Sequence, residues 1–149
     1  MQWIRRLAIG VLSLGILVGC ATTGEQQMAT AQRPLYDRLG GKPAITAVVD
    51  DFVARVAADR RINRFFANTD VPPFKAKLVD QICEASGGPC KYTGKDMKTS
   101  HAGMGVTEAD FNALVEDLVA TLDKFKVPEK EKGELLSVLG PMKKDIVTR

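Results

Sequence analysis

Apolar residues recur at intervals of three and four along the chain after residue 34, which is the spacing of one face of an α-helix. The first such stretch covers residues 43–58, and its proline at position 43 suits the first helical turn. Its apolar side is formed by Ile45, Val48, Val49, Phe52, Val53 and Val56. No convincing period-two strand interrupts the pattern, so the sequence predicts an all-α fold.

A second helix is expected in the middle of the chain, after a short turn over residues 59–66. It opens at Pro72 or Pro73 and runs to about residue 86, where two glycines and a proline at positions 87–89 stop it. Its apolar side is formed by Phe74, Leu78, Val79 and Ile82. A short helix is then expected over residues 95–101.

Two longer helices complete the prediction. Thr107, with Asp110 three residues later, has the pattern of an N-terminal cap and predicts a helix to about residue 125. The last helix is expected to open at Pro128. Its buried side chains are expected to be Leu135, Leu136, Val138, Leu139, Met142 and Ile146. Together these helices can enclose one hydrophobic core.

The first twenty residues have a different pattern. Arg5 and Arg6 precede an uncharged apolar stretch over residues 7–18, and Gly19 and Cys20 follow. This is the order of a secretory signal peptide, and the stretch is shorter than the roughly 20 residues that a bilayer span needs. A short buried helix is the alternative.

Residues 17–20 also resemble a bacterial lipobox, in which Cys20 is the lipidated residue and the membrane anchor. The alanine after it implies the outer membrane. We therefore expect a lipoprotein signal peptide over residues 1–19, the lipidated cysteine with a flexible tether over 20–33, and a folded domain over 34–149 facing the periplasm.

Composition and charge narrow the function. The 149 residues, 45% of them hydrophobic and 26% charged, predict one globular domain. The net charge of +3 falls to about +1 without Arg5 and Arg6, which leaves 19 basic against 18 acidic residues. No basic cluster is interleaved with aromatic residues, so no nucleic-acid partner is expected. The single histidine excludes zinc sites built on two or three histidines.

Cys83 and Cys90 flank a Gly-Gly-Pro turn after the second predicted helix. A chain that reverses there can bring the two sulfur atoms together, and an exported protein reaches an oxidising compartment. We therefore expect a disulfide between them. A redox-active pair is the alternative, but the spacing is not the C-x-x-C of oxidoreductases.

An all-α domain with one histidine invites interpretation as a haem protein, although a lone histidine is usually a surface or hydrogen-bonded residue. Met97 lies one helical turn before His101, on the same face. Further motifs accompany this pair: LYDRLGG at residues 35–41, AITAVVDDF at 44–52, FF at 65–66, GGP at 87–89, YTG at 92–94, VP at 127–128 and ELL at 134–136. In this order and spacing, residues 34–147 resemble a group I truncated haemoglobin.

That resemblance implies a two-over-two helical sandwich around haem b, with His101 as the proximal ligand of the iron. The second imidazole nitrogen of His101 is then expected to donate to a backbone carbonyl one turn back. Phe66 is expected to pack on the porphyrin, and the proximal pocket is expected to be lined by Met97, Val106, Phe111 and Leu114. Candidate partners of the propionates are Tyr92, Lys77 and Thr69, of which Tyr92 is the best placed.

The distal side departs from the family, which usually has a tyrosine directly after the phenylalanine of the early helix. Here Val53 follows Phe52, and Phe74 and Leu78 stand where glutamines usually face the haem. Each lost hydrogen bond contributes about 0.5–1.5 kcal/mol net, so O₂ binding is expected to be weak, with CO and NO less affected.

Two residues of the predicted distal helix leave alternatives open. Gln81 is either a substitute donor from deeper in the pocket or a solvent-facing residue. Lys77 is expected to face water or a propionate, with ligation of the iron as the alternative.

The resemblance implies a haem protein that binds O₂, CO or NO, or that carries out redox or sensing chemistry at the periplasmic face of a membrane, with an unidentified redox partner. We expect such a protein rather than a dedicated enzyme, because no general acid–base pair is visible on the distal side. The alternative is a haem-free globin-fold lipoprotein that acts as a structural or partner-binding domain. The retained His101, Tyr92, Phe66 and Met97 favour the first, and the missing distal donors favour the second.

Overall fold

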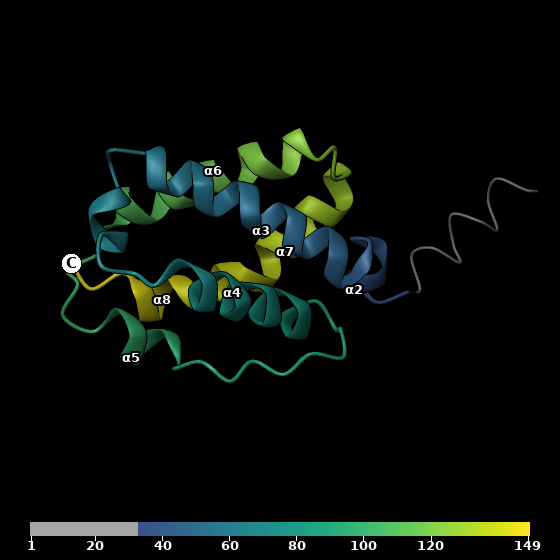
Figure 1. The fold of residues 1–149 in the computed structure, drawn as a ribbon, viewed down its shortest axis with the longest axis horizontal. Helices are drawn as coiled ribbons and strands as arrows, with labels where there is room; N and C mark the ends of the chain where they lie inside the picture. Colours follow the sequence, from purple (N-terminus) through teal and green to yellow (C-terminus); the bar gives the residue numbers. More distant parts are fainter. Residues whose placement is uncertain (1–32) are drawn as a thin grey trace, which may run out of the picture.

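A computed structural model describes residues 33–149, and these residues form helices and turns without any strand (Figure 1). The all-α prediction is therefore confirmed. The predicted signal peptide, Cys20 and nearly all of the predicted tether lie outside the described residues. Within residues 33–149, no helix combines the length and hydrophobicity needed to cross a membrane.

The described chain opens with the short helix α2 (Leu35–Arg38), which the apolar pattern does not predict. The long helix α3 (Gly41–Ala58) follows at once and begins two residues before the predicted Pro43. Gly40 and Gly41 have positive φ angles of 93° and 71°, which glycine adopts readily, so the chain turns directly from α2 into α3.

Helix α3 is the centre of the core and packs on both α4 (Val71–Ala85) and α6 (Glu108–Lys124), as Figure 1 shows. The short 3₁₀ helix η1 (Asn63–Phe66) occupies the predicted turn before α4. The predicted apolar faces supply the buried core, which includes Ile45, Val49, Phe52, Val53, Val56, Val79, Ile82, Leu118 and Leu122. The spacing of apolar residues therefore predicted which sides of these helices are buried.

Helix α6 begins with the predicted cap. The Thr107 hydroxyl accepts from the Asp110 N–H at 3.2 Å, and the Asp110 carboxylate accepts from the Thr107 N–H at 3.0 Å. These reciprocal bonds form a capping box. The Thr107 hydroxyl also donates to the Asp110 carboxylate at 2.7 Å, and this bond, then the Thr107 N–H, then the guanidinium of Arg64 at 2.7 Å lower the pKa of Asp110. The cap fixes the start of α6 beside η1.

The prediction of one continuous last helix is wrong. The chain forms α7 (Glu129–Leu139), the 3₁₀ helix η2 (Gly140–Met142) and the short helix α8 (Lys143–Ile146). Pro141 has no N–H to donate and its ring crowds the preceding turn, which accounts for the break. Leu135 and Ile146 are buried as predicted, but Val138 is 38% exposed because it lines an open groove beside α2.

Candidate functional site

The single histidine lies at the end of the short helix α5 (Met97–His101), which begins two residues later than predicted. Asp96 explains this start, because its carboxylate accepts from the Thr99 N–H at 2.8 Å and caps the helix. Helix α5 packs on α8, at the lower side of the molecule in Figure 1. The histidine is therefore held between two short elements rather than inside the α3–α6 core.

The imidazole of His101 is oriented by its own helix. Its Nδ1 lies 2.7 Å from the Met97 carbonyl oxygen, and because a carbonyl only accepts, Nδ1 carries the hydrogen. The predicted bond to a carbonyl one turn back is therefore present. Nε2 is left as the nitrogen with a free lone pair, on a side chain that is half-buried. This is the tautomer that binds a metal ion.

Apolar side chains predicted for the distal wall lie on α3 and α4. Phe52 and Val53 are buried in α3, and Phe74 and Leu78 are half-buried on α4 and pack against the core. The ring centroids of Phe66 and Phe74 lie 5.6 Å apart in a tilted pair. This wall offers apolar contact surface and no hydrogen-bond donor.

Two of the predicted proximal residues, Val106 and Phe111, lie near α8, whereas Leu114 packs against the hydrophobic core. Val106 is buried just before α6, and its carbonyl accepts from the Thr148 N–H at 2.9 Å, which ties the end of the chain to this segment. Phe111 is half-buried, and the Lys143 ammonium of α8 lies 5.7 Å from the centre of its ring. Val106, Phe111 and α8 therefore flank the side of the molecule on which α5 packs.

Gln81 joins the predicted distal helix to this proximal group. Its side-chain nitrogen lies 3.5 Å from the sulfur atoms of both Met97 and Met142. The residue is half-buried, so the structure does not support the solvent-facing alternative. The contact brings α4 to α5 and to η2, and the apolar pattern did not predict the role of Met142 in it.

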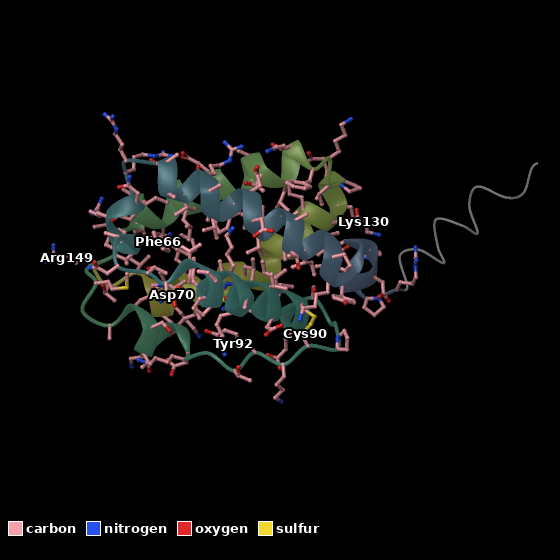
Figure 2. All side chains as sticks on the ribbon, viewed as in Figure 1. Phe66, Asp70, Cys90, Tyr92, Lys130 and Arg149 are labelled. Carbon is pink, nitrogen blue, oxygen red and sulfur yellow. A yellow bond between two sulfur atoms is a disulfide. The ribbon has the colours of Figure 1, made fainter. Side chains whose placement is uncertain are left out.

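Tyr92 is fixed on the segment that runs beneath α4 toward α5 (Figure 2). Its N–H donates to the Glu84 carboxylate at 2.9 Å, and its hydroxyl donates to the Lys95 carbonyl oxygen at 2.8 Å. Burial and then the nearby Asp96 charge raise the pKa of Tyr92, so the phenol is neutral and donates. A Cβ at Gly94 would overlap the Tyr92 ring, so this position requires glycine.

Lys77 reaches the same segment from α4. Its ammonium donates to the Thr93 hydroxyl, a partner that sequence reasoning missed. The contact gives Lys77 a polar partner near the outer end of the site, in keeping with the expectation that it faces outward rather than toward a metal. Thr93 follows the candidate Tyr92 directly, so Lys77 on α4 reaches the segment that carries Tyr92, and two of the three predicted propionate partners lie near each other.

The predicted disulfide between Cys83 and Cys90 is present, with the two Cα atoms 5.7 Å apart. Cys83 is fully buried near the end of α4, and Cys90 opens the segment that carries Tyr92 (Figure 2). A Cβ at Gly88 would overlap the Tyr36 ring and the Cys83 sulfur, so the turn between the cysteines depends on glycine there. The disulfide therefore ties the distal helix to the chain that leads to His101.

Within residues 33–149, no three histidine, cysteine, aspartate or glutamate side chains gather to hold a bare metal ion. The donor set is instead one imidazole nitrogen amid apolar and aromatic side chains, with polar groups at one end. That set suits a metal whose other ligands come from a flat apolar macrocycle. The open groove between α2, α4 and α7 contains none of the predicted site residues.

Comparison with known proteins agrees with this arrangement. Residues 34–148 match the profile of the bacterial-like globin family. The group 1 truncated hemoglobin GlbN of Mycolicibacterium paratuberculosis is 37% identical over 114 residues, which cover 76% of this chain and 84% of that protein. Its counterpart from Synechocystis is 38% identical over 110 residues, covering 71% of this chain and 89% of that protein.

Two solved structures are similar over most of the chain. The Fe(III) form of truncated hemoglobin from Tetrahymena pyriformis has a TM-score of 0.75 and 34% identity, covering 78% of this chain and all of that one. The 2/2 hemoglobin from Synechococcus, in the cyanomet state with covalently attached heme, has a TM-score of 0.74 and 33% identity, with coverage of 78% and 100%.

Proposed function

This chain belongs to the bacterial-like globin family as a truncated haemoglobin of the two-over-two type, and from that premise we propose that His101 is the proximal ligand of its haem iron. Haem binding and the binding of diatomic gases are properties of that family. The observation that carries the proposal is the 2.7 Å bond from His101 Nδ1 to the Met97 carbonyl oxygen, which leaves Nε2 free for iron.

The surrounding residues fit a haem. Phe66, Phe74 and Leu78 offer half-buried apolar surface on one side, and the half-buried Phe111 beside the buried Val106 offers it on the other. The ammonium of Lys77 has three N–H donors, of which the Thr93 hydroxyl takes one, so it suits a propionate. The neutral phenol of Tyr92 would donate to a propionate by turning its single O–H away from the Lys95 carbonyl oxygen. When bound to His101, a haem would supply an iron atom that can take a diatomic ligand.

The apolar distal wall supports weak O₂ binding. Bound O₂ carries negative charge that hydrogen-bond donors stabilise, and Val53, Phe74 and Leu78 supply none. CO carries less charge, so its binding depends less on donors. We expect faster O₂ dissociation than in relatives that carry a distal tyrosine. Val53→Tyr is expected to slow O₂ dissociation, by roughly tenfold for each 1.4 kcal/mol that the new hydrogen bond contributes to O₂ binding.

The proposed site of action is the periplasmic face of a membrane, with Cys20 as the lipid anchor. The order of basic, apolar and small residues over positions 1–20 supports export. The Cys83–Cys90 disulfide suits an oxidising compartment. At that place we propose ligand binding with a redox or sensing role and an unidentified partner protein, because the distal residues Val53, Phe74 and Leu78 include no general acid–base pair for a dedicated enzyme. Loss of membrane fractionation and of palmitate labelling in Cys20→Ala would support the anchor, and unchanged fractionation would contradict it.

The test of haem ligation is a spectrum. The purified full-length chain in detergent is titrated with haemin, reduced, and exposed to CO, beside His101→Ala and the neighbouring Ser100→Ala as a control. We expect a sharp CO-bound Soret band that His101→Ala abolishes and Ser100→Ala retains. Spectra of free haem that ignore both substitutions would favour the haem-free partner-binding alternative.

A further inference from the structure

Basic residues gather at the end of the molecule where α5 packs on α8. Residues 94–105 and 140–149 form this end, and they include five basic and two acidic residues. The other described residues include 14 basic and 15 acidic residues. The excess positive charge of the domain is therefore concentrated at this end, which Figure 1 shows on the side of the C-terminus.

Four of the five basic side chains at this end are exposed and make no ion pair within residues 33–149. We call the cationic end the four residues Lys95, Lys98, Lys144 and Arg149. The fifth, Lys143, binds Glu108 at 3.0 Å. Elsewhere in the described chain, seven of the 14 basic side chains form ion pairs. The cationic end thus presents charges that remain available to another molecule.

The two acidic residues at this end leave the positive charge in place. The Asp96 carboxylate accepts from both the N–H and the hydroxyl of Thr99, each at 2.8 Å, because it caps α5. Asp145 is half-buried on α8 and forms no ion pair with the cationic end. Neither carboxylate is therefore an internal partner for the exposed ammonium groups.

The cationic end lies beside the proposed ligand of the iron. Lys98 is on α5, three residues before His101, and Lys144 is on α8, which packs on α5. The Arg149 side chain lies against Gly105, where an added Cβ would be 3.2 Å from the guanidinium nitrogen Nε. A protein that docks on these side chains therefore contacts the helix that carries His101.

This end also lies away from the proposed lipid anchor. Cys20 precedes α2 in the chain, so the anchored segment enters the described domain at α2. Figure 1 shows α2 and α5 at opposite ends of the domain. The end that an anchor holds near a membrane is thus not the cationic one, which favours a protein over a lipid surface as its ligand.

We propose that the cationic end is the docking surface for a partner protein that presents an acidic patch. This rests on the proposed function and deepens it, because it assigns a surface and a charge to the partner of the redox or sensing role. Complementary charge speeds association and selects partners of opposite sign. Binding is therefore expected to weaken as the ionic strength rises.

The test uses the full-length chain in phosphatidylcholine nanodiscs, with an acidic [2Fe–2S] ferredoxin as the probe. One variant combines Lys95→Glu, Lys98→Glu and Lys144→Glu, and a control combines Arg33→Glu, Lys126→Glu and Lys130→Glu. All six positions are exposed, and both variants reverse three charges. At low salt, we expect the first to weaken ferredoxin binding by roughly tenfold and the control by less than about threefold. A wild type that does not bind ferredoxin, or two variants that weaken binding equally, overturns the proposal.

A milder variant covers loss of stability. Lys95→Gln, Lys98→Gln and Lys144→Gln together remove three charges without placing a negative charge in the last turn of α5. We expect an unchanged urea midpoint and weaker ferredoxin binding, by a smaller factor than with glutamate. If the glutamate variant unfolds more easily, the glutamine variant decides, and unchanged binding by it overturns the proposal.

Amine-reactive labelling, read by mass spectrometry, separates a protein partner from a membrane. In phosphatidylglycerol nanodiscs, Lys95, Lys98 and Lys144 are expected to react until ferredoxin is added, and Lys130 is expected to react throughout. Protection of the three lysines by the anionic lipid alone would identify a membrane-binding surface and overturn the proposal. A chain that binds ferredoxin at this end but takes up no haem overturns the proposed function and retains the docking surface.

Discussion

The regions on the two sides of α3 differ in how completely protein contacts bury their side chains. Toward α2, α6 and α7, the apolar side chains are buried, and the Arg38 side chain, which is 8% exposed, binds both Glu131, at 2.6 Å, and Glu134 on α7. On the α4 side, in the part of the molecule where α5 packs on α8, Phe66, Phe74 and Phe111 are only half-buried. Among the described residues, His101 makes a side-chain hydrogen bond only within its own helix. On the first side, contacts within the protein bury the apolar side chains. On the second side, apolar and aromatic side chains remain partly exposed, as expected where a cofactor completes the packing.

The largest predicted effect comes from replacing one leucine in each of the two regions by alanine. Leu122 on α6 is 1% exposed, so Leu122→Ala is expected to lower the free energy of unfolding by about 2–5 kcal/mol, with or without haem. Leu78 on α4 is half-buried, so in the haem-free chain Leu78→Ala is expected to lower the free energy of unfolding by less than Leu122→Ala does. The loss caused by Leu78→Ala is expected to be larger in the haem-bound chain than in the haem-free chain. Urea unfolding with and without haemin measures both.

A cost for Leu78→Ala that does not depend on haem would contradict the comparison. It would mean that α4 is completed by protein contacts alone, as α6 is.

The second prediction concerns the disulfide that joins the two regions. Replacing Cys83 and Cys90 by serine frees a loop with a sequence separation of 7 residues, which is expected to cost about 2.5 kcal/mol in the chain-entropy account. We also expect amide hydrogen exchange to increase selectively over residues 91–96. Without the disulfide, this segment is held to α4 by hydrogen bonds with the side chains of Lys77 and Glu84. Uniform exchange across α3 and α6 would contradict a local role.

The third prediction is smaller and lies on that segment. Tyr92→Phe removes the hydroxyl that donates to the Lys95 carbonyl oxygen and is expected to lower stability by about 0.5–1.5 kcal/mol. Because the phenol is also the proposed propionate partner, haemin affinity is expected to fall. An equilibrium haemin titration, beside Thr99→Ala on α5 as a control, checks this, and unchanged affinity would remove Tyr92 from the propionate end.

The features that could be predicted from the sequence are those that depend on near neighbours. The capping box needs residues three apart, the His101 bond needs one helical turn, and the disulfide needs one reversal at a Gly-Gly-Pro turn. Each depends on local backbone geometry, so spacing alone is informative.

Features that depend on distant contacts were missed. Gln81 and Met142 are 61 residues apart in sequence, and their contact lies at the break in the last helix, where η2 leads into α8. Val138 has the spacing of a buried residue but lies beside an open groove whose other walls come from α2 and α4. Helical periodicity shows which side of a helix is apolar, but it does not show how far a neighbouring element extends to cover it.

The smallest predicted effect concerns the packed side of α3, where α6 lies. Asp117 on α6 is 8% exposed, and one of its carboxylate oxygens has no partner among the described residues. Burial, and then the charge of Asp59, raise the pKa of Asp117 above its ordinary value of 3.8. A carboxyl whose pKa is higher in the folded than in the unfolded chain binds protons more tightly when folded, so its contribution to stability falls as the pH rises through that range.

Asp117→Asn removes that charge and is therefore expected to stabilise the chain at pH 7, by less than about 1 kcal/mol. The gain is expected to shrink as the pH falls toward 3.8, where the wild-type carboxyl is also protonated. Thermal unfolding of both proteins between pH 7 and pH 4 measures it. A loss of stability at pH 7 would show that the charges of Arg61 and Arg55, which lower the same pKa, outweigh the effect of burial on Asp117.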